Sequence, residues 1–320
     1  MRRLVECVPN FSEGANISVI DAIAAAIRSV PGVLLLDRSS DPDHNRTVIT
    51  IAGGPEAVLE AALRAVGTAA ELIDLRKHRG EHPRIGATDV LPFVPVSGVT
   101  LEDCAALAHA AGREIWQRYR IPVYFYEAAA IRPERESLAN VRKGGFEGLR
   151  EAIQSDPGRT PDIGEPRLHP SAGAVAVGAR KFLIAYNINL NTADLEIAKR
   201  IARSVRPSSG GLPFVKAMAV NLRTRGLAQV SMNLTDFEQT PLHRVFTRVK
   251  YEAERHGVSI ACSQVVGLIP RRALEIPAGC DLQLENFSAD QVFESRLESA
   301  ENERSAQPST PQSVTTKTRG

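Results

Sequence analysis

The 320-residue sequence has few aromatic residues and almost no excess of charge. Lys and Arg total 39 against 37 Asp and Glu, and aromatic residues are 5%, so nothing favours a nucleic-acid or anionic-membrane partner. No run approaches the roughly 18 apolar residues of a membrane span. The N-terminus also lacks the apolar stretch of a signal peptide. The sequence therefore predicts a soluble, cytoplasmic protein that binds neither nucleic acid nor membranes.

Cysteine is scarce as well, and the spacing of the cysteines indicates neither a redox motif nor a metal site. The four cysteines, Cys7, Cys104, Cys262 and Cys280, form no CxxC pair and no metal-binding pattern. We expect free thiols in a reducing compartment and no bound metal. Hydrophobic residues make up 43% and charged residues 24%, which is ordinary globular composition and excludes wholesale disorder.

Hydrophobic periodicity predicts an alternation of strands and helices. In the first half we expect strands at 4–8, 33–37, 47–52, 90–96 and 122–126 and helices at 17–30, 55–75 and 101–119. In the second half we expect strands at 182–190, 215–222, 227–234 and 258–264 and helices at 192–205 and 241–256.

Both halves thus contain the order strand, helix, strand, strand, helix, strand. This order predicts an α+β protein of two tandem ferredoxin-like (βαββαβ) subdomains. A single doubly wound sheet is the alternative, disfavoured because hairpin-type strand pairs recur in both halves. We expect the first subdomain at 1–178, the second at 179–300 and a disordered polar tail at 301–320. The proline-rich segment 154–172 is either a linker or a binding loop.

The densest polar cluster is residues 76–84, RKHRGEHPR, which contains His78, Glu81 and His82. The spacing of these three residues matches the HxxEH pattern of one class of zinc enzymes. That chemistry needs both histidines on one helical face, and Pro83 moves its predecessor away from helical backbone angles. The zinc interpretation is therefore the weaker one.

A single histidine acting as general acid and base fits this cluster better, with Arg84 holding an anionic substrate. His82 is the stronger choice because Pro83 fixes its backbone and Glu81 and Arg84 flank it. His78 lies nearer the end of the preceding helix and could simply cap it.

Two further loops carry polar side chains that could contact a ligand. Residues 41–46 supply Asp43 and Asn45 for a cationic or amide group and Arg46 for a carboxylate, although such residues are also common turn formers. Residues 10–14, NFSEG, follow the first strand and are a third candidate. A glycine-rich run at 173–181 fails the P-loop pattern, because Ala179 stands where a lysine is required. For Gly178 we expect instead a packed strand.

The sequence resembles the glutamate formimidoyltransferases over residues 4 to 293. The similarity lies in long, ordered motifs: LVECVPNFSEG (4–14), DHNRT (43–47), LIDLRKH (72–78), GEHPRIGA (80–87), PFVPV (92–96), GARKFLIAYNINL (178–190), QVSMNL (229–234) and VGLIP (266–270).

The resemblance implies transfer of a formimino group from N-formimino-L-glutamate to tetrahydrofolate, a co-substrate, during histidine breakdown. It implies a homodimer of chains that each contain two ferredoxin-like subdomains. The animal enzymes continue into a cyclodeaminase domain, whereas this sequence continues into a polar tail. We therefore expect a separate cyclodeaminase to act on the product.

The resemblance places the catalytic histidine at His82. It places the folate-contacting loop at 164–173, where the match is looser: Gly164, Glu165, Pro166, Arg167, Leu168, His169, Pro170, Ser171, Ala172 and Gly173. Asp43 or Glu81 would orient His82 or face the cationic amidine, and Arg84 and Arg46 would hold carboxylates.

Two other functions stay open at this point. The same pocket could accept N-formylglutamate or 5-formyltetrahydrofolate, because one =NH to =O difference is read by one or two hydrogen bonds. The chain could also be a ligand-binding protein without activity, although the intact 80–87 motif argues against this.

Overall fold

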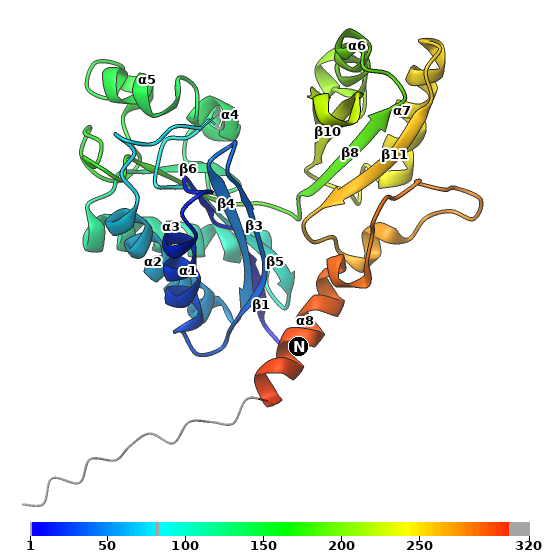
Figure 1. Ribbon diagram of the computed structural model, residues 1–320. Helices are drawn as coiled ribbons and strands as arrows, with labels where there is room; N and C mark the ends of the chain where they lie inside the picture. The colour runs from blue at the N-terminus through cyan, green and yellow to red at the C-terminus, as the bar shows by residue number, and fades with distance from the viewer. Residues whose placement is uncertain (1, 81–82, 307–320) are drawn as a thin grey trace, which may run out of the picture.

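The computed structural model describes residues 2–80 and 83–306, and two sheets organise them (Figure 1). The first sheet begins with the predicted βαββαβ order. Its elements are β1 (Leu4–Cys7), α1 (Ile17–Arg28), β3 (Val33–Asp41), β4 (Arg46–Gly53), α2 (Pro55–Leu72) and β5 (Thr88–Ser97). The strands lie in the order β3-β4-β1-β5, and all neighbours are antiparallel. This is the ferredoxin-like arrangement that the sequence predicts.

Local sequence explains where these helices begin and which face they bury. Asn16 caps α1, because its side chain accepts hydrogen bonds from the amides of Ser18 and Val19. Pro55 begins α2, at a position where its missing N–H costs nothing. The buried residues of α1 recur at helical spacing, and Figure 1 shows α1, α2 and α3 together on one side of the sheet.

The first sheet is larger than a ferredoxin-like unit. A short strand, β2 (Asn10–Phe11), pairs with β4 and β5. Beyond β5, the helix α3 (Leu101–Tyr119) leads to β6 (Val123–Glu127), and β7 (Val175–Ala179) inserts between β5 and β6, parallel to both. The predicted strand around Gly178 is thus confirmed as β7.

Segment 154–172 is not a linker between the sheets. Ile163 bridges to Val123 of β6, and the segment leads into β7 of the same sheet. The chain crosses to the second sheet only between Ala179 and Ile184. The boundary predicted at 178/179 therefore cuts β7 one residue before its end.

The second sheet has the same ferredoxin-like order without an extension. It contains β8 (Ile184–Leu190), α6 (Leu195–Val205), β9 (Val215–Leu222), β10 (Leu227–Leu234), α7 (Leu242–Arg255) and β11 (Ile260–Val266). The strand order is β11-β8-β10-β9, and all pairs are antiparallel. Asp194 caps α6 through the amide of Glu196, two residues after the predicted start at 192.

The last helix, α8 (Phe293–Ala306), packs against the first sheet. Phe293 lies in a cluster with Leu34 and Leu36 of β3, and its ring meets Phe182 edge-on at 5.2 Å. The Nε of Arg296 donates to the backbone oxygen of Leu36 at 2.9 Å. Because α8 continues to Ala306, residues 301–306 are helical, contrary to the tail predicted from 301. Residues 307–320 lie outside the described part of the chain.

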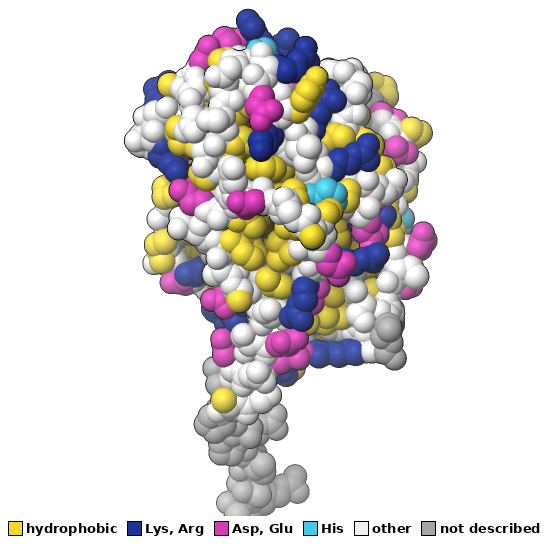
Figure 2. Space-filling model, turned by 90° about the vertical axis from the view of Figure 1, so that its right-hand side faces the viewer, with side chains coloured by type: hydrophobic (Ala, Val, Ile, Leu, Met, Phe, Trp, Pro, Cys, Tyr) yellow, Lys and Arg dark blue, Asp and Glu magenta, His cyan; other side chains and the backbone are white. Residues whose placement is uncertain are grey.

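The remaining elements are short. Two short helices, α4 (Leu138–Val141) and α5 (Gly145–Ala152), follow β6. The described residues also contain 3-10 segments at Pro133–Arg135, Pro157–Arg159, Pro207–Ser209, Arg223–Arg225, Arg271–Leu274 and Ala289–Gln291. On the face shown in Figure 2, basic side chains are interspersed with acidic and hydrophobic ones. Within 2–80 and 83–306, no helix combines the length and apolarity that crossing a membrane requires.

Removing the Phe293 ring should destabilise the whole chain, because this ring is 1% exposed where α8 meets β3. We expect Phe293→Ala to lower the free energy of unfolding by about 3–5 kcal/mol, measured by urea denaturation. Glu298→Ala in the same helix is the control, since its side chain is 69% exposed. Equal stability of the two variants would contradict the packing described for α8.

Candidate active site

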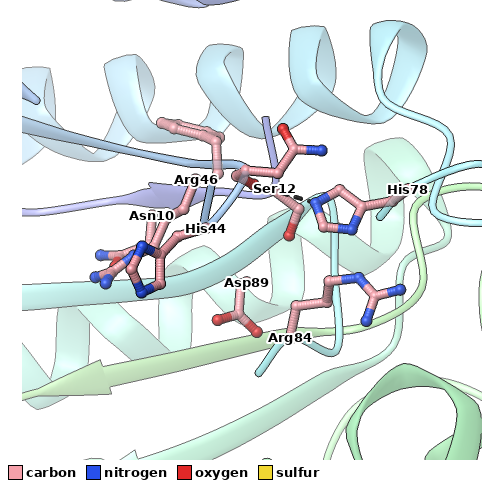
Figure 3. A pocket seen from close by; sticks show the side chains of 9 residues that line it. Asn10, Ser12, His44, Arg46, His78, Arg84 and Asp89 are labelled. Atoms are coloured by element: carbon pink, nitrogen blue, oxygen red, sulfur yellow. Dashed lines mark hydrogen bonds between the residues drawn. The ribbon is translucent and has the colours of Figure 1, made fainter. Parts of the chain in front are cut away.

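A polar pocket opens at one end of the first sheet, where β2, the β3–β4 turn and the segment before β5 meet (Figure 3). Its lining residues come from four separate stretches of sequence: Asn10, Phe11, Ser12, His44, Asn45, Arg46, His78, Arg84 and Asp89. In the view of Figure 3, Asn10, His44 and Arg46 lie at one side and His78 at the other.

Asn45 holds these stretches together. Its side-chain oxygen accepts from the amide of Gly14 at 2.8 Å, and its side-chain nitrogen donates to the backbone oxygen of Arg79 at 2.8 Å. Its own backbone oxygen contacts Nε2 of His78 at 3.1 Å. Asn45 has a φ of 48°, in the left-handed region that Asn tolerates better than most residues. One side chain thus connects the β3–β4 turn to the loops after β2 and α2.

Gly80 lets the loop after α2 approach this turn. A Cβ at position 80 would lie 2.5 Å from the backbone oxygen of His44 and 2.8 Å from the Cβ of Asn45. Any larger residue would therefore push the loop away from Asn45, and the close approach explains why a glycine stands here.

His78 is a buried histidine with one ring nitrogen in use. It is 7% exposed, and the backbone oxygen that it contacts can only accept, so Nε2 is the donor. Burial lowers the pKa of His78 below its usual value, and the charge of nearby Arg84 lowers it further. The imidazole is therefore neutral at neutral pH, and Nδ1 carries a lone pair.

Arg46 supplies a partly buried cation. Its guanidinium donates to the side-chain oxygen of Asn10, and its buried Nε has no hydrogen-bond partner in the described part of the chain. Burial lowers the pKa of Arg46 to about 10, with the charge of Arg142 contributing, so the group still carries its charge at neutral pH. An anion in the pocket would offset both the burial and the repulsion.

Two ion pairs surround this cation. Asp89, on β5, accepts from the amide of Ile85 at 2.8 Å and from the guanidinium of Arg142, which follows α4. Arg84 donates to Glu147 of α5 at 2.9 Å and is 12% exposed. The carboxylates of Asp41 and Glu13 also act on Arg46 and His78, respectively.

Buried polar atoms without partners gather at this pocket. In residues 2–80 and 83–306, they include Nε of Arg46, Arg84 and Arg142 and Nδ1 of His78. Buried donors and acceptors are nearly always satisfied in folded proteins, so several together mark a place where a ligand or water completes the bonding.

Three of the residues predicted from sequence meet here, namely Asn45, Arg46 and Arg84. Asp43 does not, because it is exposed in the β3–β4 turn and is not among the lining residues. The predicted His82 and Glu81 lie outside the described residues.

None of the residues of the predicted folate loop, 164–173, is among those that line the pocket. Gly164 packs against the ring of Trp116, while Glu165, Pro166 and Arg167 are exposed. At the other end, the backbone of Ser171 and Ala172 accepts from the amides of Leu75 and Ala87. His169 accepts from the amide of Ala172 through Nδ1, and burial lowers its pKa.

Sequence reasoning did not identify Asp89, Arg142 and Glu147. Asp89 lies at the start of an apolar strand, and a single carboxylate in such a position does not by itself indicate a functional site. Its partner Arg142 lies 53 residues further on, and Glu147 lies 63 residues from Arg84. Asn10 and Ser12 were recognisable only as part of a polar loop after the first strand.

Comparison with known families identifies both halves of the chain. The model of the formiminotransferase domain, N-terminal subdomain, matches residues 4–180. The model of the formiminotransferase domain matches residues 185–290. Together they span both sheets.

Individual relatives agree. A glutamate formimidoyltransferase from Streptococcus pyogenes serotype M1 is 47% identical over 93% of this chain and 99% of its own length. One from Thermoplasma acidophilum is 46% identical with the same coverage. The formimidoyltransferase-cyclodeaminase of Mus musculus is 48% identical over 86% of this chain but only 51% of its own length. The chain therefore belongs to the formiminotransferase family of transferase enzymes.

Proposed function

We propose that the chain transfers the formimino group of N-formimino-L-glutamate to tetrahydrofolate, giving 5-formiminotetrahydrofolate and L-glutamate. The observation that carries this proposal is the pocket at Asn45, which is lined by a partly buried, incompletely bonded Arg46 and by a neutral His78. The names of the full-length relatives supply the substrate class.

The pocket suits the two carboxylates of a glutamate donor. Arg46 and Arg84 each have a buried Nε without a partner, so each can gain a hydrogen bond to an anion. A guanidinium binds a carboxylate through two parallel N–H donors, which fixes the orientation of the substrate as well as its charge.

The reaction exchanges one amine for another at the formimino carbon. N5 of tetrahydrofolate attacks this carbon and forms the new C–N bond. The tetrahedral intermediate then breaks its bond to the glutamate nitrogen. The proton lost from N5 ends on that nitrogen, so a single histidine can take it up and return it.

We assign this proton transfer to His82. Its neighbours support the assignment, because Gly80 contacts the β3–β4 turn and Arg84 lines the pocket. Glu81 is proposed to orient His82 or to steady the amidinium. Asp43 is the weaker candidate for that role, since it is exposed outside the pocket.

Tetrahydrofolate is proposed as the co-substrate, with residues 164–173 contacting it. The support is indirect: Ser171 and Ala172 are hydrogen-bonded to the segments that carry His78 and Arg84. We propose no metal for this reaction, because proton transfer and carboxylate binding account for the chemistry.

The wider setting is part of the same proposal. The reaction belongs to histidine breakdown in the cytoplasm, and the chain acts as a homodimer. The Mus musculus relative carries a cyclodeaminase in its name and extends well beyond the matched region. We propose that here a separate cyclodeaminase takes the product.

A second candidate function is formyl transfer from N-formylglutamate, or the handling of 5-formyltetrahydrofolate, in the same pocket. The carboxylate contacts at Arg46 and Arg84 would be identical for the formyl donor. A side-by-side assay of purified protein with tetrahydrofolate and either donor separates the two functions.

Replacing the proposed acid–base residue tests the mechanism. We expect His82→Ala to lower kcat with N-formimino-L-glutamate by about 10²–10⁴-fold, because no group then relays the proton from N5. Steady-state turnover, followed spectrophotometrically, gives the number. His243→Ala is the matched control. His243 lies in α7, which belongs to the unit of the second sheet, and this variant should retain wild-type kcat. Wild-type turnover in the His82 variant would remove His82 from the mechanism.

Arg46 should govern the affinity for the donor rather than the rate. We expect Arg46→Lys to raise KM for N-formimino-L-glutamate by about tenfold or more, because lysine keeps the charge but loses the planar pair of donors. Arg118→Lys is the control, since Arg118 is bonded to Glu60 and Glu114 away from the pocket. An unchanged KM in the Arg46 variant would exclude its contact with the substrate carboxylate.

A further inference from the structure

Nδ1 of His78 can accept a hydrogen bond, whereas the unpartnered nitrogens of the neighbouring arginines can only donate. Nε2 is committed to the backbone oxygen of Asn45 at 3.1 Å, and the buried Nδ1 has no hydrogen-bond partner among residues 2–80 and 83–306. The other lining residues with unpartnered buried atoms are Arg46 and Arg84, which can only donate. Among the lining residues, His78 is therefore the one whose unpartnered buried atom can accept a hydrogen bond from an N–H of a ligand.

Fixing the Nε2 bond fixes the tautomer. A backbone oxygen cannot donate, so Nε2 carries the hydrogen and Nδ1 of the neutral ring carries none. The backbone oxygen of Asn45 is itself held in place, because the Asn45 side chain is bonded to Gly14 and Arg79. His78 therefore presents a lone pair in a fixed position, and rotating the ring would break the bond to Asn45.

We propose that His78 selects the formimino donor over the formyl donor by accepting a hydrogen bond at Nδ1 from the formimino N–H. This inference rests on the proposed function, because it assigns a role within the same pocket. The formimino group carries hydrogen on its terminal nitrogen and is a donor. The formyl group ends in an oxygen that can only accept, and its lone pairs would face the lone pair of Nδ1.

The burial of Nδ1 increases the difference in binding between the formimino and the formyl donor. Nδ1 is shielded from water, so a ligand that offers no donor leaves it unsatisfied. A site built around a substrate N–H discriminates strongly against an analogue that lacks it, since the unpaired buried group persists in the complex. Arg46 and Arg84 would bind the carboxylates of both donors alike, so they contribute affinity and not this selectivity.

The test separates the two ring nitrogens with two amide substitutions. His78→Gln can keep a donor near the Nε2 position, bonded to the Asn45 oxygen, while the acceptor at the Nδ1 position is lost. His78→Asn can place an oxygen near the Nδ1 position while the bond to Asn45 is lost. For each variant, kcat/KM is measured with tetrahydrofolate and N-formimino-L-glutamate or N-formyl-L-glutamate.

We expect His78→Gln to lower kcat/KM for the formimino donor by about 10–100-fold and to leave the value for the formyl donor within about threefold, so that the ratio of the two collapses. His78→Asn should lose activity with both donors but retain most of the wild-type ratio. His109→Gln is the matched control, because Nε2 of His109 also contacts a backbone oxygen, that of Ala129 at 2.9 Å, outside the pocket.

Each outcome decides a different point. An equal loss with both donors in His78→Gln would overturn the role of Nδ1 and leave the proposed reaction intact. Absence of transfer by the wild-type chain with either donor would overturn the reaction and the inference together. As a readout that folding defects do not imitate, the ¹⁵N signal of Nδ1 should shift on adding N-formimino-L-glutamate alone and stay in place with the formyl analogue.

Discussion

The hydrogen bonds of Asn45 are the constraint on which the rest of the site depends. Three segments that are far apart in sequence, around Gly14, Asn45 and Arg79, meet through one side chain and one backbone oxygen. Ile73, Leu75 and Ile85 anchor the segment after α2 in the apolar core. Between these anchors, the hydrogen bonds of Asn45 and the close approach at Gly80 decide where the loop meets the β3–β4 turn. His78 receives both its position and its tautomer from this arrangement. Apolar anchors thus hold the ends of the site's loops, and polar contacts set the geometry between them.

Electrostatics builds on that geometry. Arg46 and Arg142 both lie near Asp89, and their mutual repulsion adds to the cost of burying Arg46. Asp89 cannot neutralise both, because its carboxylate already accepts from Arg142 and from the amide of Ile85. A buried cation with an unused donor is unfavourable in the empty pocket and becomes favourable when an anion arrives. An anion that binds here would satisfy the unpartnered donor of Arg46 and offset its charge, and both effects would contribute to the free energy of binding.

The sequence predicts the parts of this structure that are local. Apolar periodicity finds most helices and strands, and the recurrence of one order of elements in both halves predicts two ferredoxin-like units. It does not predict that β7 inserts between β5 and β6. Parallel pairing joins β7 to residues 86 positions earlier in β5 and 52 positions earlier in β6, and the irregular segment 154–172 lies in between. The site follows the same rule. Asn45, Arg46 and Arg84 stand in dense polar motifs, whereas Asp89 and Arg142 form their pair only after the chain has folded.

The choice of histidine at position 78 follows from its neighbours. A carboxylate at position 78 could also accept a hydrogen bond from an amidine, and its negative charge would bind the amidine more strongly than a neutral imidazole does. However, Arg84 is close enough to lower the pKa of His78, so a carboxylate in its place would attract the guanidinium and withdraw it from the substrate. A neutral imidazole accepts one hydrogen bond without forming that ion pair. The pocket can then present acceptor and cations side by side, which is the combination that a donor with two carboxylates and one amidine requires.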